Sequence, residues 1–430
     1  MKKYFLIGIK GAGMSALASI LTDIGHQVYG SDIEDMLFTQ VELEAKGIAM
    51  NSFGTNVIES DMEVIVGNAF SDDHDDVVYA RQVGAKVIRY HDFLGELTSG
   101  YTSVAISGTH GKTTTSGMLA HVMRLNYKTS YLIGDGTGKG VKDSPYFVYE
   151  ACEYKRHFLA YHPDYAIITN IEHDHPDYFK DEDDVIDAFV SFASQCKKKV
   201  IACGDDKNVR EKLEMSNLVT YGFEDGNNFI AKNILKDSDG TTFDVIIDGI
   251  FYYTFKTPFF GDHMILNSLA VIAVCYFEGL DAKFIAKDLS LFDGVKRRFS
   301  ITLQGSQIII DDYAHHPTEI EVTLRAVRQK YPGKELVAIF QPHTVTRTKA
   351  FVNEFKDTLK LADHVYLTEI FGSARENSNM EDINILVDSD ETFELITTES
   401  VSELKQYENG VLVFMGAGDI EKYENAYLRI

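Results

Sequence analysis

The sequence predicts an α/β fold with three domains, each built around a mainly parallel β-sheet. Its 430 residues suffice for roughly three domains of ordinary size. Short apolar runs alternate with stretches of helical periodicity along most of the chain. Two of these runs end in Gly-rich turns that open onto a helix, which is typical of nucleotide-binding domains. Changes in the pattern place the domains at residues 1–98, 99–295 and 296–430.

The composition is that of an ordinary globular protein, with 45% apolar and 25% charged residues. The formal net charge of −24 argues against nucleic acid or an anionic membrane as a partner, because both would repel this surface. No apolar stretch is long enough to span a bilayer, and the first residues do not resemble a signal peptide. The four cysteines form no C-x-x-C pair, so we expect a reduced, cytoplasmic protein.

The first domain is predicted to be Rossmann-like. An apolar strand over residues 4–9 ends in Gly11-x-Gly13-x-x-Ala16, which fits the dinucleotide fingerprint, and a helix follows. Asp32 stands about 20 positions further on, where a ribose hydroxyl is usually held. The fingerprint predicts a bound diphosphate; the alternative is a Gly-rich turn that only packs helix on strand. The residues expected at the ligand are Gly11, Ala12, Gly13, Met14, Ser15 and Asp32.

The remainder of this domain continues the alternation of strand and helix. Strands are expected at 26–29, 62–66 and 86–89, and a helix at 75–82. This is the pattern of a doubly wound sheet.

The second domain opens with the stretch around which the prediction of function is organised. A strand over 102–106 runs into a Gly-rich turn with a Lys-Thr pair at a helix start, and helical spacing continues over 116–125. Backbone N–H groups there can wrap phosphate oxygens, Lys112 adds a point charge, and the Thr113 hydroxyl can reach Mg²⁺. The longer form of this motif has Gly in place of Ile106, so the match is to G-x-x-G-K-T; the alternative is an ordinary turn. The loop residues are Gly108, Thr109, His110, Gly111, Lys112, Thr113 and Thr114.

Two further strands of this domain, at 146–150 and 165–171, end in polar residues. In an open parallel sheet, ligands sit beyond the carboxyl ends of the strands, so these residues should lie beside the phosphate loop. Glu150 and His175 could then complete Mg²⁺ coordination. Histidine is an uncommon Mg²⁺ ligand, so His175 could equally form a strand-end hydrogen bond. The acidic run at 181–184 is better explained as the start of a helix.

The rest of the second domain is predicted as a strand at 199–203, an antiparallel flank over 229–256 with two hairpin turns, and helices at 263–277 and 284–291. Asn267 is one of few polar residues in an apolar helix. Its side chain either faces the nucleotide or forms hydrogen bonds with nearby backbone groups.

The third domain again alternates strands and helices. Strands are expected at 307–310, 335–340, 364–368 and 411–415, and helices at 318–330 and 349–361.

The polar residues of the third domain gather after its strands. His315 and His316 stand beside aspartates, as in a metal site, but Pro317 begins a helix next to them and no third and fourth ligand has zinc spacing. We therefore favour substrate contacts at this place.

Six motifs occur in an order and spacing that resemble the Mur ligases, and the likeness covers all three domains. The motifs are Gly8-Ile9-Lys10-Gly11-Ala12-Gly13-Met14-Ser15, Gly108-Thr109-His110-Gly111-Lys112-Thr113-Thr114, Thr169-Asn170-Ile171-Glu172 with Asp174-His175, Arg297-Arg298-Phe299, Asp311-Asp312-Tyr313 with His315-His316-Pro317, and Phe340-Gln341-Pro342-His343.

The resemblance implies an ATP- and Mg²⁺-dependent ligase, as a monomer or homodimer. Within the family it points to the type that joins L-alanine to UDP-N-acetylmuramate through an acyl phosphate. The first domain would bind the UDP part of the substrate and the central domain would bind ATP. The last would bind the amino acid and close over the nucleotide, as expected if a reactive acyl phosphate must be kept from water.

The same resemblance implies roles for particular residues. Lys112 would hold the β- and γ-phosphates. The implied metal ligands are Thr113, Glu150 and His175. The implied ATP contacts beyond the loop are Asn267, Arg298 and Asp312. The implied amino-acid contacts are Tyr313, His315 and Arg347. Lys112, Glu150, His175, Arg298 and Asp312 make up the implied catalytic set.

Four positions depart from the family pattern. Met264 replaces a common Asn, and Cys152 replaces an acidic residue. Thr344 stands where Arg is frequent, and Lys10 where Gly is frequent. Amino-acid binding would then depend more heavily on Arg347, and Lys10 could add charge near the diphosphate.

Three rival functions are open at this point. A ligase of the same family could attach a preformed peptide. A nicotinamide oxidoreductase could be built on the first domain, although it would leave the phosphate loop unexplained. A nucleotide-gated regulatory protein would hydrolyse ATP slowly and without regard to UDP-sugar or amino acid.

Overall fold

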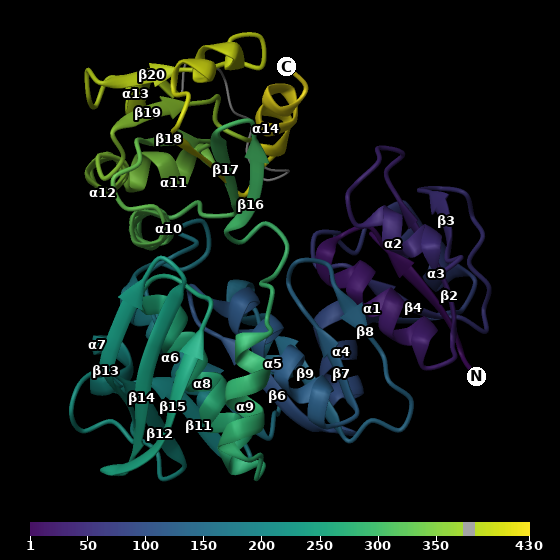
Figure 1. Cartoon of the computed structure of the whole chain (residues 1–430). Coiled ribbons are helices and arrows are strands. Elements are labelled where there is room, and N and C mark those ends of the chain that lie inside the picture. The colour runs from purple at the N-terminus through teal and green to yellow at the C-terminus, as the bar shows by residue number, and fades with distance from the viewer. Residues whose placement is uncertain (373–382) are drawn as a thin grey trace.

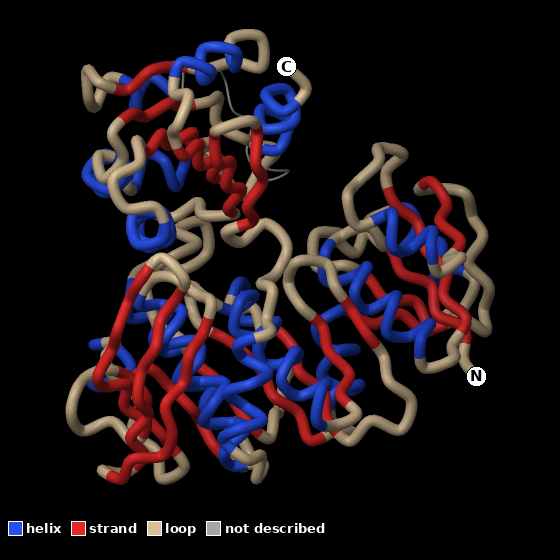
Figure 2. Tube along the Cα trace, viewed as in Figure 1, coloured by secondary structure: helices blue, strands red, loops and turns tan. Residues whose placement is uncertain are grey.

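The computed structural model describes residues 1–372 and 383–430 and confirms three α/β domains, seen as three separate bodies in Figure 1. Each domain has a sheet with a buried apolar core on both faces. Figure 1 and Figure 2 show helix α10 (Pro317–Lys330) of the C-terminal domain next to loops of the central domain, at the place where these two domains meet. No helix among the described residues is long and apolar enough to cross a membrane.

The N-terminal domain has a five-stranded parallel sheet of order β3-β2-β1-β4-β5. The order reverses between β1 and β4, and a crevice for ligands forms at such a point. The predicted helix at 75–82 and the strands at 62–66 and 86–89 are confirmed to within one residue. The elements are β1 (Lys3–Ile7), α1 (Ala12–Asp23), β2 (Gln27–Asp32), α2 (Gln40–Ala45), β3 (Ala49–Ser52), β4 (Glu63–Val66), α3 (Asp75–Gln82), β5 (Lys86–Arg89) and α4 (Tyr90–Thr98).

The central domain has a ten-stranded mixed sheet of order β15-β14-β13-β12-β11-β10-β6-β9-β7-β8. Its strands are β6 (Thr102–Ser107), β7 (Thr129–Leu132), β8 (Gly138–Lys139), β9 (Tyr146–Glu150), β10 (Tyr165–Ile168), β11 (Lys199–Cys203), β12 (Leu218–Gly222), β13 (Phe229–Asp237), β14 (Gly240–Ile247) and β15 (Ile250–Thr257). Its helices are α5 (Lys112–Asn126), a 3₁₀ segment (Tyr154–Ala160), α6 (Glu182–Ser194), α7 (Lys207–Lys212), α8 (Asp262–Phe277) and α9 (Ala282–Ser290).

The antiparallel flank is confirmed, because β13, β14 and β15 pair as two successive hairpins at one edge of the central sheet. The strand predicted at 165–171 is too long, since β10 ends at Ile168. Beyond it, Thr169 and Asn170 turn toward the phosphate loop: the Asn170 side chain accepts from the His110 N–H at 2.8 Å. Binding the loop is what ends the strand.

The C-terminal domain has a six-stranded sheet of order β16-β17-β21-β18-β19-β20, parallel except for the edge strand β16. Its strands are β16 (Ser300–Gln304), β17 (Gln307–Asp312), β18 (Leu336–Phe340), β19 (His364–Leu367), β20 (Phe393–Leu395) and β21 (Val411–Met415). Its helices are α10 (Pro317–Lys330), α11 (Val345–Ala350), α12 (Val352–Leu359), α13 (Asn384–Val387), a 3₁₀ segment (Val401–Gln406) and α14 (Glu421–Leu428).

The single helix predicted at 349–361 is wrong. Two helices, α11 and α12, occupy this region and are separated at Phe351, whose φ of −122° and ψ of 27° are not helical. The Phe351 ring packs edge-on against the His316 ring, with centroids 4.9 Å apart. Tertiary packing of this ring therefore overrides the local helical pattern.

The N-terminal domain is joined to the central one by close packing of α1 against β7 and β8 (Figure 1). Gly138 and Gly140 lie directly on the helix, where added Cβ atoms would collide with the backbone carbonyl oxygens of Ala16 and Ile20. Lys139 forms an ion pair with Asp23 of α1 at 3.1 Å. Two glycines therefore let the chain lie close against α1, and an ion pair adds to the contact.

Candidate functional site

The phosphate loop lies between β6 and α5 in the predicted form. Gly108 and Gly111 have φ of +134° and +84°, a region that side chains other than glycine rarely adopt. Helix α5 begins at Lys112, so its free N–H groups point at the loop. The loop therefore has the backbone of an anion-binding turn.

Lys112 is held inside this loop. Its Nζ donates to the carbonyl oxygens of Gly108 at 2.5 Å and Thr109 at 2.9 Å, and lies 3.0 Å from Oε2 of Glu153. Burial opposes the charge, but the Glu153 carboxylate raises the pKa of Lys112, so the ammonium stays protonated. A cation is thus kept in place for phosphate.

The predicted metal ligands lie in two pairs, and one pair includes a residue that the sequence did not single out. The Thr113 hydroxyl donates to Oε2 of Glu150 at 2.9 Å, whereas His175 lies 3.6 Å from Oε1 of Glu153. Glu153 is 3% exposed and contacts both His175 and Lys112. Its only signal in the sequence is its place in the polar run after β9.

The oxygen-bearing side chains of these two pairs suit a magnesium ion. The Thr113 hydroxyl and the Glu150 and Glu153 carboxylates are the hard oxygen donors that Mg²⁺ prefers, and the hydrogen bond of 2.9 Å between Thr113 and Glu150 holds two of them side by side. Burial raises the pKa of Glu150, although Lys112 opposes this, and a bound cation would further favour the ionised carboxylate. Bound Mg²⁺ would supply positive charge against the charge that develops during phosphoryl transfer.

A cavity of about 560 Å³ opens beside the loop, between the central and C-terminal domains. His110, Gly111 and Thr114 line it on the loop side, and Asn267 of α8 also borders it. Apolar side chains from the central domain form much of its wall: Phe259, Phe260, Met264, Phe292 and Val295. An apolar cavity beside a phosphate loop suits a nucleoside.

Arg298 and Asp312 line the same cavity from the C-terminal domain. The Arg298 guanidinium lies over the Tyr313 ring at 5.0 Å. Asp312 accepts from the N–H groups of Phe299 and Ala314, each at 2.8 Å, which fixes the chain around Arg298. Both residues therefore lie at the cavity beside the phosphate loop, and their contact with ATP stays a prediction.

Arg347, an expected amino-acid contact, is engaged in a buried ion pair across the junction. Its Nη2 and Nε lie 2.8 and 3.3 Å from Oδ1 of Asp174 in the central domain. Burial opposes ionisation of Asp174, but the guanidinium holds the pKa of that carboxyl well below its usual range. The role of Arg347 toward an amino acid stays a prediction.

Glu319 of α10 is a second junction residue that sequence reasoning missed. Its two oxygens lie 2.9 Å from Nδ1 of His315 and 3.2 Å from Nδ1 of His110. On its other side, His110 lies 3.3 Å from Glu172. Burial opposes the charged ring, yet hydrogen bonds to Glu172 and Glu319 raise the pKa of His110 to about 9. The junction between the two domains therefore contains histidine and glutamate side chains that pair with one another.

The expected diphosphate residues lie at the N-terminus of α1, which begins after Gly11, at the order reversal of the sheet. Asp32 ends β2 and is 5% exposed. Its oxygens accept from the N–H groups of Lys10 at 2.6 Å and Ile33 at 2.8 Å. Asp32 therefore fixes the Gly-rich turn, and its contact with a ribose stays a prediction.

Replacing Asp32 by alanine should loosen this turn. We expect the KM for the UDP-sugar to rise about tenfold, because a buried backbone N–H loses its acceptor, while the KM for ATP changes little. Steady-state kinetics with each substrate varied in turn measure this. Asp35→Ala in the same loop is the matched control. Equal effects on both KM values would contradict the assignment of this domain.

The departures from the family pattern have structural counterparts. Sδ of Met264 lies 4.0 Å from Nδ2 of Asn267, so it replaces a hydrogen-bonding neighbour with a weak acceptor. Thr344 caps α11 by accepting from the Arg347 N–H. The Lys10 ammonium donates to the carbonyl oxygens of Ile33 and Asp35, and so is tied to that loop.

Asp311, the last but one residue of β17, has a buried carboxyl group whose effect on stability can be measured. Burial, with Glu424 and Glu421 nearby, raises the pKa of Asp311 to about 7, although Arg297 opposes this. The folded protein then binds this proton more tightly than the unfolded chain, so stability is lost as pH rises from about 4 to about 7.

Asp311→Asn should therefore raise the melting temperature at pH 8, by removing a cost on the order of 4 kcal/mol, and should raise it less at pH 5. Thermal unfolding across this pH range measures it. Asp388→Asn, an exposed residue of the same domain, is the control. A pH-independent gain at position 311 would show that the carboxyl is not buried as described.

Comparison with known proteins covers nearly the whole chain. Residues 3–102 match the model for the Mur ligase family catalytic domain, residues 106–275 the Mur ligase middle domain, and residues 297–418 the Mur ligase glutamate ligase domain. The UDP-N-acetylmuramate–alanine ligase of Thermotoga maritima is 28% identical over all of this chain and 98% of its own, with a TM-score of 0.83.

Other solved structures are also similar. The UDP-N-acetylmuramate:L-alanyl-γ-D-glutamyl-meso-diaminopimelate ligase from Neisseria meningitidis is 27% identical over 69% of this chain and all of its own, with a TM-score of 0.61. The MurF ligase of Thermotoga maritima, in complex with ADP, shares the fold at 15% identity over all of this chain and 97% of its own, with a TM-score of 0.67. The chain therefore belongs to the Mur ligase family of ATP-dependent ligases of peptidoglycan precursor synthesis.

Proposed function

We propose that the protein joins L-alanine to UDP-N-acetylmuramate in an ATP- and Mg²⁺-dependent reaction. The observation that carries this proposal is the phosphate loop, whose cavity is closed from the other side by Arg298 and Asp312. A ligase of this kind must hold ATP between two bodies that exclude water. The likeness to the alanine ligase of Thermotoga maritima, which spans the full chain, supports alanine as the amino acid.

In the proposed reaction, a carboxylate oxygen of the muramyl group attacks the γ-phosphorus of ATP and ADP leaves. The amine nitrogen of alanine, having lost a proton, attacks the acyl carbon of the resulting acyl phosphate, and phosphate leaves. Both partners in the first step are anionic, so cations must offset their repulsion. Lys112 holds one such charge at the loop, and Arg298 supplies another at the cavity beside the loop.

A second candidate is a ligase that attaches a preformed peptide. It is favoured by the likeness to the Neisseria meningitidis enzyme, whose identity to this chain is almost as high. Both candidate reactions would use the same phosphate loop of this chain. They differ only in the incoming amine.

Phosphate release with ATP, Mg²⁺ and UDP-N-acetylmuramate tests both candidates against a panel of L-alanine, glycine, L-serine and a tripeptide. The proposal expects release that depends on UDP-N-acetylmuramate and is fastest with L-alanine. Release only with the tripeptide would establish the second candidate. Slow release that ignores both the UDP-sugar and the amine would contradict ligase function altogether.

A further inference from the structure

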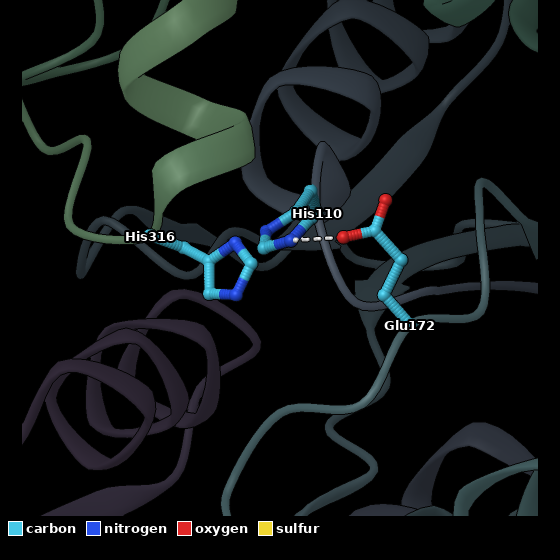
Figure 3. A group of neighbouring side chains, drawn as sticks. All are labelled: His110, Glu172 and His316. Atoms are coloured by element: carbon cyan, nitrogen blue, oxygen red, sulfur yellow. Dashed lines mark ion pairs between the residues drawn. The ribbon is translucent and has the colours of Figure 1, made fainter. Parts of the chain in front are cut away.

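We propose that His110, Glu172 and His316 form a binding site for a transition-metal dication of the Zn²⁺ class, distinct from the residues expected to hold Mg²⁺. One ligand atom from each residue lies within 4.8 Å of the other two. Figure 3 shows the two imidazole rings and the carboxylate converging, with the His110–Glu172 ion pair dashed. They come from the phosphate loop, the segment after β10 and the residue that caps α10.

The donor set favours a borderline metal over Mg²⁺. Two imidazoles and one carboxylate are ligands that Zn²⁺ and Co²⁺ take readily in three-residue sites with a solvent molecule in fourth position. Mg²⁺ instead prefers oxygen atoms, which Thr113, Glu150 and Glu153 offer at the other cluster. The chemistry of the donors thus separates the two sites.

His316 is suited to a ligand role. It is 5% exposed, and its Nε2 is buried without a hydrogen-bond partner. Nδ1 of His316 accepts from the Thr318 N–H at 3.4 Å, a long bond, so metal binding at Nε2 requires the ring proton to move to Nδ1 and this bond to be lost. In that tautomer the lone pair of the buried Nε2 has no partner, and a cation would provide one.

Glu319 would orient the other imidazole. Oε1 of Glu319 lies 3.2 Å from Nδ1 of His110, while Nε2 of the same ring faces Glu172. A carboxylate behind a metal-bound imidazole is the usual arrangement that fixes the ring and strengthens it as a ligand. To bind the metal, His110 must release the proton at Nε2, and the ligand atoms must draw together to reach bonds of about 2 Å.

A metal at this place would link the central domain to the C-terminal domain, because His316 belongs to the latter and the other two ligands to the former. If the proposed ligase function holds, opening of the junction is part of each cycle, and the bound metal would slow turnover. Metal binding itself does not depend on that function.

The test is titration of the full-length protein with Co²⁺ in the presence of excess Mg²⁺, with no nucleotide or substrate. Four-coordinate Co²⁺ absorbs visible light far more strongly than octahedral Co²⁺, and Zn²⁺ should remove the signal by competition. We expect His316→Ala and the isosteric Glu172→Gln to raise the Kd for Co²⁺ at least tenfold. His175→Ala and His121→Ala should leave the Kd unchanged.

Two outcomes would overturn the proposal. One is the absence of strong visible absorption at any Co²⁺ concentration up to the millimolar range. The other is a signal lost in His175→Ala but kept in His316→Ala and Glu172→Gln, which would place the ion at the magnesium residues. Thermal unfolding of each variant shows whether a lost signal reflects lost folding, and Glu172→Gln preserves the size of the side chain if His316→Ala does not fold.

Discussion

Replacing Lys112 by alanine is expected to reduce kcat about a thousandfold or more, the largest effect of any single substitution proposed for this protein. The ammonium is held by two loop carbonyls and by Glu153, at the start of α5 where phosphate must bind. Without it, an anionic nucleophile approaches an anionic phosphate with one charge fewer to offset the repulsion. Phosphate release at saturating ATP and UDP-N-acetylmuramate measures the loss.

The matched control is Lys283→Ala, an exposed lysine at the start of α9 in the same domain, which should retain full activity. Far-ultraviolet circular dichroism and thermal unfolding establish that the Lys112 variant is folded. Near-normal product formation by the folded variant would show that Lys112 does not serve the phosphates.

The second large effect is expected from Asp174→Asn. The substitution keeps the shape of the side chain but leaves the Arg347 guanidinium buried without its counter-charge, a change that costs about 3–5 kcal/mol. Because the pair joins two domains, the cost falls on the closed junction and not on either core. We expect a larger radius of gyration in solution scattering, faster proteolysis at residues 292–299 and a fall in kcat.

An exposed pair of the same length provides the control. Asp225 and Lys232 lie 2.8 Å apart on the surface of the central domain, and Asp225→Asn should change neither scattering nor turnover, since surface ion pairs contribute little. If Asp174→Asn behaves like Asp225→Asn, the Asp174–Arg347 pair does not hold the domains together.

The elements that depend mainly on their own residues can be predicted from the sequence. Strands β9, β11 and β21 lie at the residues predicted, because each is a short apolar run that fills a buried position in its sheet. The phosphate loop could also be predicted from the sequence, since its glycines have backbone angles that few other residues adopt.

Two contacts that could not be predicted from the sequence join residues that are distant in the chain. Glu319 meets His110 from 209 positions away, and Asp174 meets Arg347 from 173 positions away. No spacing rule relates such pairs, because only the docking of two domains brings them together. The same holds for Phe351, where contact with His316 divides a helix that looks continuous in the sequence.

The close packing of Gly138 against α1 affects whether domains can be exchanged between related proteins. The glycine leaves room for a helix carbonyl and nothing more, so compatibility depends on shape as well as on the Lys139–Asp23 ion pair. In a chimera that carries the first 98 residues of another ligase, the N-terminal domain should pack correctly on the central domain only if small residues are kept at positions 138 and 140. Grafts that ignore this requirement should misalign the UDP-sugar and the nucleotide even when each module folds.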